Sequence, residues 1–249
     1  MIALQRVPLS ADVAAELVRL TARIPPGDNK AARQLWTRSR RARASIREHL
    51  AMMAAGRGYC MYCGDGLGSS VDHHEPVARN PRRAFDWLNH LLACDYCNSH
   101  HKRDRYPVDA DGKALLLDPT AEEPLEHLFL VLSIGKYRAL TEKGRQTIEV
   151  CGLNRPLLER GRAAAVHQVA ALVTHWWLGD ADVRRTALWT LRDQPHADVL
   201  HAMFRQATLP GARAIFREDD DLIALLRNEE LRDALVVQAG AQGTEPLGQ

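Results

Sequence analysis

The stretch CDYCNSHHK, residues 94–102, decides the fold together with a second cysteine pair in CMYCG, residues 60–64. Each C-x-x-C spacing places two thiolates on one turn, and two such turns facing each other form a tetrahedral sulfur site suited to zinc. The sequence therefore predicts structural Zn²⁺ held by four ligands: Cys60, Cys63, Cys94 and Cys97. A redox dithiol or a pair of disulfides is the alternative, and an iron–sulfur cluster also stays open. The N-terminal residues show no secretory signal, which favours zinc and a cytoplasmic location.

The residues between the two pairs resemble the HNH nuclease family. A strand-like SSVDH ends in Asp72 and His73 of a D-H-x-x-P motif, Asn89 opens the stretch that leads to HLLAC, and Asn98 follows nine residues later. The match covers residues 60–105. It implies a ββα-metal fold, so the expected fold class is a mainly α chain with an embedded, zinc-stapled HNH module.

The resemblance assigns a role to each residue of the motif, and the chemistry of the residue types supports it. Asp72 and Asn98 offer two oxygens to a hard cation such as Mg²⁺ or Mn²⁺. His73 alternates to the other side of the strand, where a neutral imidazole takes a proton from water. Asn89 is the central asparagine, which ties down the loop after the first strand. The family's products carry a 5′-phosphate and a 3′-hydroxyl.

Positive charge is concentrated in front of the first cysteine pair. Residues 1–59 carry 11 Lys and Arg against 4 Asp and Glu, whereas residues 111–249 carry 16 against 20. The densest run, RQLWTRSRRARASIREHL, is expected on a helix over Asn29–Ala55. Such a run could follow a phosphate backbone, or it could be an ordinary solvated helix face. The candidate DNA contacts are Arg38, Arg40, Arg41 and Arg43.

A phosphate-contacting lysine often follows the C-N-x-x segment in the HNH family. His101 stands at that position here, so the resemblance suggests that Lys102 takes this role with a shifted register. His74 stands where the family commonly has an aliphatic residue, and it is expected on the Asp72 side of the strand.

Four sections are predicted along the chain. They are a basic helical segment at 1–56, the nuclease core at 57–110, a helical region at 111–240 and a disordered tail at 241–249. The helical region includes the stretch EEPLEHLFLVLS. Cys151 is expected to be a small buried residue, and the pair Trp176 and Trp177 is either helix core or an interface anchor.

A closer resemblance extends over residues 35–165. The stretches from YPVD to GLNRPLLERGR are similar to the HNH subunits that accompany ATPases in anti-phage defence of the Septu and retron type. This implies an SMC- or ABC-like ATPase partner.

The expected function is cleavage of DNA with weak sequence preference and no role at a membrane. Two alternatives stay open: an RNA-cleaving toxin of the tRNA-cutting type, and a zinc ribbon that binds nucleic acid without cutting it.

Overall fold

The computed structural model describes residues 1–236 of the chain. The tail expected at 241–249 lies outside these residues. Within them the chain is mainly helical and contains two small antiparallel hairpins. No helix of the described part is both long and apolar enough to cross a lipid bilayer.

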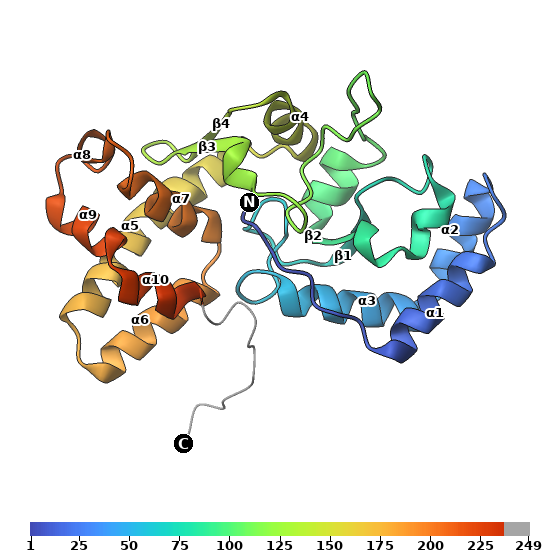
Figure 1. Ribbon diagram of the computed structural model, residues 1–249, viewed down its shortest axis with the longest axis horizontal. Helices are drawn as coiled ribbons and strands as arrows, with labels where there is room; N and C mark the ends of the chain where they lie inside the picture. Colours follow the sequence, from blue (N-terminus) through green and yellow to red (C-terminus); the bar gives the residue numbers. More distant parts are fainter. Residues whose placement is uncertain (237–249) are drawn as a thin grey trace.

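Three helices open the chain: α1 (Ala11–Ala22), α2 (Asn29–Arg38) and α3 (Arg40–Met53). The prediction of one helix over Asn29–Ala55 is wrong, because the backbone leaves the helical region at Ser39 with ψ 58°. The Ser39 hydroxyl donates to the carbonyl oxygen of Leu35 at 2.8 Å. A serine that bonds the backbone four residues earlier competes with helix continuation, so α2 ends and α3 starts in a new direction (Figure 1).

The first hairpin consists of β1 (Ser70–His73) and β2 (His90–Ala93). The strands are antiparallel, with Asp72 opposite Leu91 and His73 opposite His90. Three short helical segments surround the hairpin: η1 (Pro81–Phe85), η2 (Trp87–Asn89) and, after β2, the π-helical η3 (Tyr96–Lys102). Every residue of β2 is buried, and α3 packs against this strand.

The second hairpin lies where the sequence predicts a helix. After η4 (Pro124–Glu126), the residues form β3 (Leu128–Val131) and β4 (Lys136–Ala139). The helical interpretation of EEPLEHLFLVLS is therefore wrong for its second half. Leu128 and Leu130 are buried and alternate with half-buried neighbours, which is the two-residue period of a strand. Gly135 has φ 63° in the connection, and a Cβ there would meet the Glu159 carbonyl oxygen at 2.0 Å.

The rest of the described chain is helical. Its elements are α4 (Glu142–Cys151), α5 (Pro156–Leu178), α6 (Ala181–Asp193), α7 (Ala197–Ala207), α8 (Ala212–Ile215), α9 (Asp220–Arg227) and α10 (Glu229–Val236). The long helix α5 packs against α6, α7 and α9. Cys151 is fully buried, which confirms its prediction. The tryptophan pair divides: Trp176 is 2% exposed and belongs to the core, whereas Trp177 is 48% exposed.

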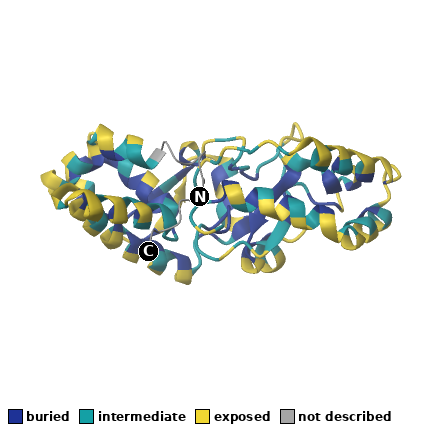
Figure 2. Ribbon diagram, turned by 90° about the horizontal axis from the view of Figure 1, so that it is seen from below, coloured by how far each residue is buried: buried dark blue, intermediate teal, exposed yellow. Residues whose placement is uncertain are grey.

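One apolar core extends through both halves of the elongated molecule, and Figure 2 shows buried residues on the inner faces of the helices on each side. This core includes residues on both sides of positions 56 and 110. The division of the chain into sections at these positions stays a prediction. A buried polar cluster holds the C-terminal half together: Asp198 accepts hydrogen bonds from Tyr137 at 2.6 Å and from Arg162 at 3.0 Å. The amide of His196 donates to the Gly64 carbonyl at 2.7 Å, which connects α7 to the first cysteine turn.

Candidate functional site

The two cysteine pairs come together, as the sequence predicts. The sulfur atoms of Cys60, Cys63, Cys94 and Cys97 all lie within 4.8 Å of one another, and all four residues are buried. The sulfurs of Cys63 and Cys94 are 3.9 Å apart. Tetrahedral zinc with Zn–S bonds of about 2.3 Å requires sulfurs about 3.8 Å apart. The cluster therefore fits a zinc site in both donor type and spacing.

The backbone of each turn fixes the cysteines. In the first turn, the Gly64 amide donates to the Cys60 carbonyl at 2.8 Å. In the second, the Cys97 amide lies 3.4 Å from the Cys94 sulfur and the Asn98 amide donates to the Cys94 carbonyl. The backbone of Asn98 is thus bonded to a cysteine of the cluster, Cys94. Because Asn98 lies in η3, the cluster fixes the position of this helical segment.

An arginine from the C-terminal half lies against the cluster. The Nη1 atom of Arg155 is 3.6 Å from the Cys97 sulfur and 3.2 Å from the Gly152 carbonyl oxygen. Four thiolates around Zn²⁺ would carry a net negative charge, which a neighbouring guanidinium would offset. Sequence reasoning missed this role, because nothing in the local spacing of Arg155 relates it to a cysteine pair.

Asp72 lies buried on one face of β1, with 3% of its surface exposed. Its Oδ2 accepts a hydrogen bond from the Tyr62 hydroxyl at 2.6 Å, and its Oδ1 accepts one from the Lys102 ammonium at 3.1 Å. Burial, followed by the nearby Asp72 charge, raises the pKa of Tyr62 well above its ordinary value. The phenol therefore stays protonated and donates to a carboxylate that remains an acceptor.

Asn98 reaches the same face of the strand. Its Nδ2 donates to the Ser70 hydroxyl oxygen at 3.0 Å, and Ser70 and Asp72 share a face because they are two residues apart in β1. This bond directs the amide nitrogen to Ser70, and the amide oxygen has no hydrogen-bond partner within residues 1–236. An amide oxygen and a carboxylate, the two donors predicted for a hard cation, thus lie over one face of the hairpin.

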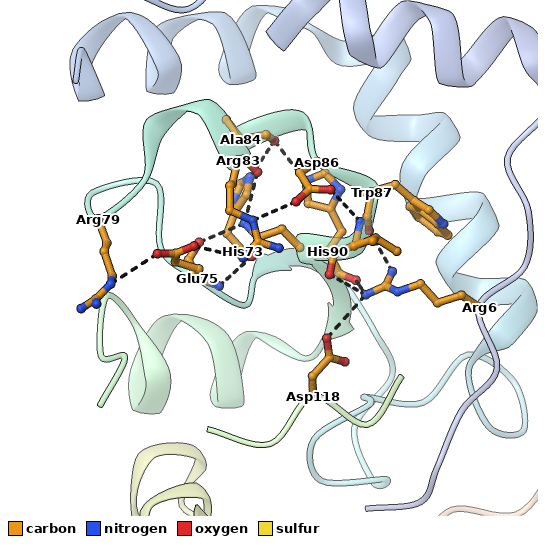
Figure 3. A network of polar contacts seen from close by, with 12 residues as sticks. Arg6, His73, Glu75, Arg79, Arg83, Ala84, Asp86, Trp87, His90 and Asp118 are labelled. Atoms are coloured by element: carbon orange, nitrogen blue, oxygen red, sulfur yellow. Dashed lines mark hydrogen bonds and ion pairs between the residues drawn. The ribbon is translucent and has the colours of Figure 1, made fainter. Parts of the chain in front are cut away.

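His73, the last residue of β1, faces the other way. Its Nε2 lies 3.0 Å from the Ala84 carbonyl oxygen, and its ring packs on Trp36 with centroids 4.5 Å apart. Burial lowers the pKa of His73, so the ring is neutral near pH 7. A carbonyl oxygen only accepts, so Nε2 carries the proton and Nδ1 has a free lone pair. Figure 3 shows this ring beside Ala84 and His90.

Asn89 is fully buried and bonds to the loop that follows β1. Its Oδ1 accepts from the Glu75 amide at 2.7 Å, and its Nδ2 donates to the carbonyls of Glu75 at 3.0 Å and Arg83 at 3.1 Å. Arg83 forms ion pairs with Glu75 at 3.0 Å and Asp86 at 2.8 Å, as Figure 3 shows. The loop residue Ala84, which orients His73, is held by these contacts.

Two further residues of this network were missed from the sequence. Arg6 donates to the carbonyls of Trp87 at 2.8 Å, Leu88 at 3.0 Å and His90 at 3.0 Å, and so clamps the entry to β2 from more than 80 residues away. His90 is fully buried, and its Nε2 also lies 3.0 Å from the Ala84 carbonyl oxygen. Its place directly after Asn89 is the one local signal that could have identified it.

The predicted DNA-contacting residues differ in exposure. Arg38, Arg40 and Arg41 are exposed and have no side-chain partner within the described residues, whereas Arg43 is half-buried. Lys102 is 0% exposed, and its predicted contact with a phosphate stays a prediction. It lies against Asp72.

Three other histidines of the region pack on tyrosine rings. His74 is buried and packs on Tyr106, with ring centroids 5.5 Å apart, and its place on the Asp72 side stays a prediction. His100 and His101 pack around the exposed Tyr96 ring.

No protein-family model matches the chain. Its sequence is similar to a protein of Bacillus mycoides (strain KBAB4), with 29% identity over 99 aligned residues. The alignment covers 34% of this chain and 34% of that protein, so the chain matches only about a third of the relative's length. The relative that shares this segment with the present chain is the Septu protein PtuB.

Proposed function

We propose that this protein is a metal-dependent HNH endonuclease that hydrolyses phosphodiester bonds in DNA. One observation carries the proposal. The oxygen donors Asp72 and Asn98 lie over one face of β1, while His73 at the end of that strand is neutral and bonded through Nε2. Phosphodiester hydrolysis needs these two functions, a cation site and a base, within reach of one phosphate.

The residues present fit a divalent cation. The Asp72 carboxylate and the Asn98 amide oxygen are hard donors from two elements of fixed relative position, and the Asn98 nitrogen is already bonded to Ser70. Bound there, Mg²⁺ or Mn²⁺ would neutralise the charge that develops on the phosphate oxygens.

The chain's own groups supply the proton transfer. His73 ends β1, so a phosphodiester lying across the end of the strand can reach both of its faces. The Nδ1 lone pair of His73 takes the proton of the attacking water, and Nε2–H donates to Ala84 so that the ring keeps its orientation. Asn89 holds the loop that contains Ala84, and the cysteine cluster holds η3 against the hairpin.

DNA would approach over the α2–α3 junction. Trp36 of α2 packs on the His73 ring, and the exposed Arg38, Arg40 and Arg41 lie within the next five residues of the chain. These guanidiniums can contact successive phosphates without reading bases, which accounts for the weak sequence preference that we expect.

The proposed biological role is anti-phage defence together with an SMC- or ABC-like ATPase partner. It is supported by the similarity to a Septu protein and by the stretches outside the HNH core that resemble nuclease subunits of such systems. Plaque counts on cells expressing the chain with an ATPase encoded beside it, compared with the same pair carrying His73→Ala, test this role. Equal plaque counts with both pairs and with empty cells would contradict it.

The biochemical activity is tested with purified protein on duplex DNA, single-stranded DNA and tRNA, with Mg²⁺, Mn²⁺ or EDTA. We expect DNA cleavage that requires a divalent ion and leaves 5′-phosphate ends. Cleavage of tRNA with intact DNA would replace the proposal by the RNA-cutting alternative. Binding without cleavage of any substrate would favour the zinc-ribbon alternative.

A further inference from the structure

Lys102 is a fully buried lysine at the candidate metal site. Its side chain is 0% exposed, and its ammonium lies 3.1 Å from Asp72 Oδ1 and 2.7 Å from the His73 carbonyl oxygen. Lysine is almost never buried to this extent unless it is paired. Here the pair is complete, because the buried carboxylate and the buried ammonium neutralise each other.

The position of Lys102 follows from η3. Asn98 and Lys102 are four residues apart, so their side chains leave the same face of the helical segment. That face lies over β1, where Asn98 bonds Ser70 and Lys102 bonds Asp72. The ammonium therefore lies beside the two oxygen donors that would hold a divalent ion.

Both carboxylate oxygens of Asp72 already have donors. Tyr62 occupies Oδ2 with a neutral hydroxyl, and Lys102 occupies Oδ1 with a positive charge. A neutral donor leaves the charge of the carboxylate available to a cation, but an ammonium cancels it. A divalent ion at Asp72 has to displace Lys102 or share the carboxylate with it against charge repulsion.

We propose that Lys102 is a resident cation that competes with the divalent ion for Asp72 and so sets the metal affinity of the site. This inference rests on the metal site of the proposed function. When the concentration of free divalent ion is low, Lys102 neutralises the charge of Asp72 and holds its carboxylate in place. When that concentration rises, the divalent ion displaces the Lys102 ammonium from the carboxylate. The site then folds without a catalytic ion and is loaded only above a threshold set by the lysine.

The test is a titration of Mn²⁺ into the zinc-loaded full-length protein without DNA, followed by the electron paramagnetic resonance signal of free Mn²⁺. Lys102→Met keeps the length of the buried side chain and removes its charge. We expect it to bind Mn²⁺ at least tenfold more tightly than the wild type. Lys113→Met, which removes an exposed lysine outside the candidate metal site, is the control and should leave the affinity unchanged.

Asp72→Asn separates failure of this inference from failure of the proposed function. If Asp72→Asn abolishes Mn²⁺ binding but Lys102→Met binds Mn²⁺ no more tightly than the wild type, the competition is wrong and the metal site stands. If Asp72→Asn leaves Mn²⁺ binding unchanged, the metal site itself is misplaced and both proposals fail.

A second measurement covers the case in which Lys102→Met folds poorly. Loss of the ammonium leaves Asp72 as a buried charge held by Tyr62 alone, which destabilises the metal-free protein. Mn²⁺ should then restore the melting temperature of Lys102→Met and raise that of the wild type much less, because ligand binding stabilises the folded state. An equal rise in both proteins would overturn the competition.

Discussion

His73 and His90 share one hydrogen-bond acceptor. The Nε2 atom of each ring lies 3.0 Å from the carbonyl oxygen of Ala84, and the ring centroids are 5.1 Å apart. Since a carbonyl oxygen has two lone pairs and only accepts, both rings carry their proton on Nε2. A second histidine thus fixes the loop carbonyl that orients the proposed base.

This pairing predicts how stability depends on pH. Burial, and then the neighbouring His73, hold the pKa of His90 well below its ordinary value of 6.5. The unfolded chain therefore binds a proton before the folded protein does, and stability falls as the pH drops below about 6.5. His90→Gln keeps an N–H donor but does not titrate. Urea unfolding between pH 7 and pH 5 measures the free energy of unfolding. We expect this free energy to fall less steeply with decreasing pH in the variant than in the wild type, by up to about 1.4 kcal/mol per pH unit. Equal slopes would contradict the neutral, buried state of His90.

Asn89→Ala should destabilise the protein and also impair cleavage. The variant loses three hydrogen bonds to the loop backbone and leaves their partners buried, so the free energy of unfolding should fall by about 3 kcal/mol. Cleavage per folded molecule should fall as well, because the loop no longer holds Ala84.

Asn154→Ala is the control for this prediction. Asn154 makes two bonds of 2.8 Å to the Tyr137 backbone in the C-terminal half. Its loss should lower stability but leave cleavage per folded molecule unchanged. If both variants cut DNA like the wild type, the positioning role of Asn89 is wrong.

Removal of zinc should unfold the hairpin region. Cys94→Ala takes away one of the four clustered ligands, whereas Cys151→Ala changes a buried cysteine outside the cluster. Metal analysis should find one zinc ion per chain in the wild type and in Cys151→Ala, and much less in Cys94→Ala. We expect the melting temperature of Cys94→Ala to fall by about 10 °C or more, because binding of a structural metal contributes folding free energy. Normal zinc content in Cys94→Ala would exclude the four-cysteine site.

DNA affinity should depend steeply on salt through the α2–α3 junction. Replacing Arg38, Arg40 and Arg41 by Gln removes three phosphate contacts, so the slope of log K against log salt should become less negative by about 2.7. The same change at three exposed arginines of the C-terminal half, Arg205, Arg213 and Arg217, is the control and should leave the slope as it is. If the first triple variant leaves the slope of log K against log salt unchanged, the basic run is an ordinary solvated helix face and not a DNA contact.

The local patterns of the site could be predicted from the sequence. The two C-x-x-C spacings predict the sulfur cluster, and strand alternation predicts that Asp72 and His73 face opposite sides. These features depend on residues close together in sequence. The contacts of Arg6 and Arg155 could not be predicted, because each joins segments far apart in the sequence whose proximity only the complete fold creates.

The errors have local physical causes. Ser39 ends a helix that the apolar spacing would continue, because its hydroxyl bonds the Leu35 carbonyl. The Leu128–Val131 segment forms a strand because the turn at Gly135 lets it pair with β4. A short apolar run in the sequence does not distinguish a strand from a buried helix segment. The burial of Lys102 against Asp72 could not be predicted, because it depends on how η3 packs on β1.

The most direct test of the central claim compares His73→Ala with His100→Ala in one plasmid-cleavage assay with Mn²⁺. His100 lies on η3, which begins beside the four-cysteine cluster, but its side chain is exposed and stacks on Tyr96. Both variants should keep their zinc, and cleavage is compared per folded molecule because His73→Ala loses the packing of its ring on Trp36. The account predicts that His100→Ala cuts at the wild-type rate and that His73→Ala is slower by about a hundredfold or more, the usual contribution of a general base. Equal cleavage by the two variants, with zinc retained in both, would contradict it.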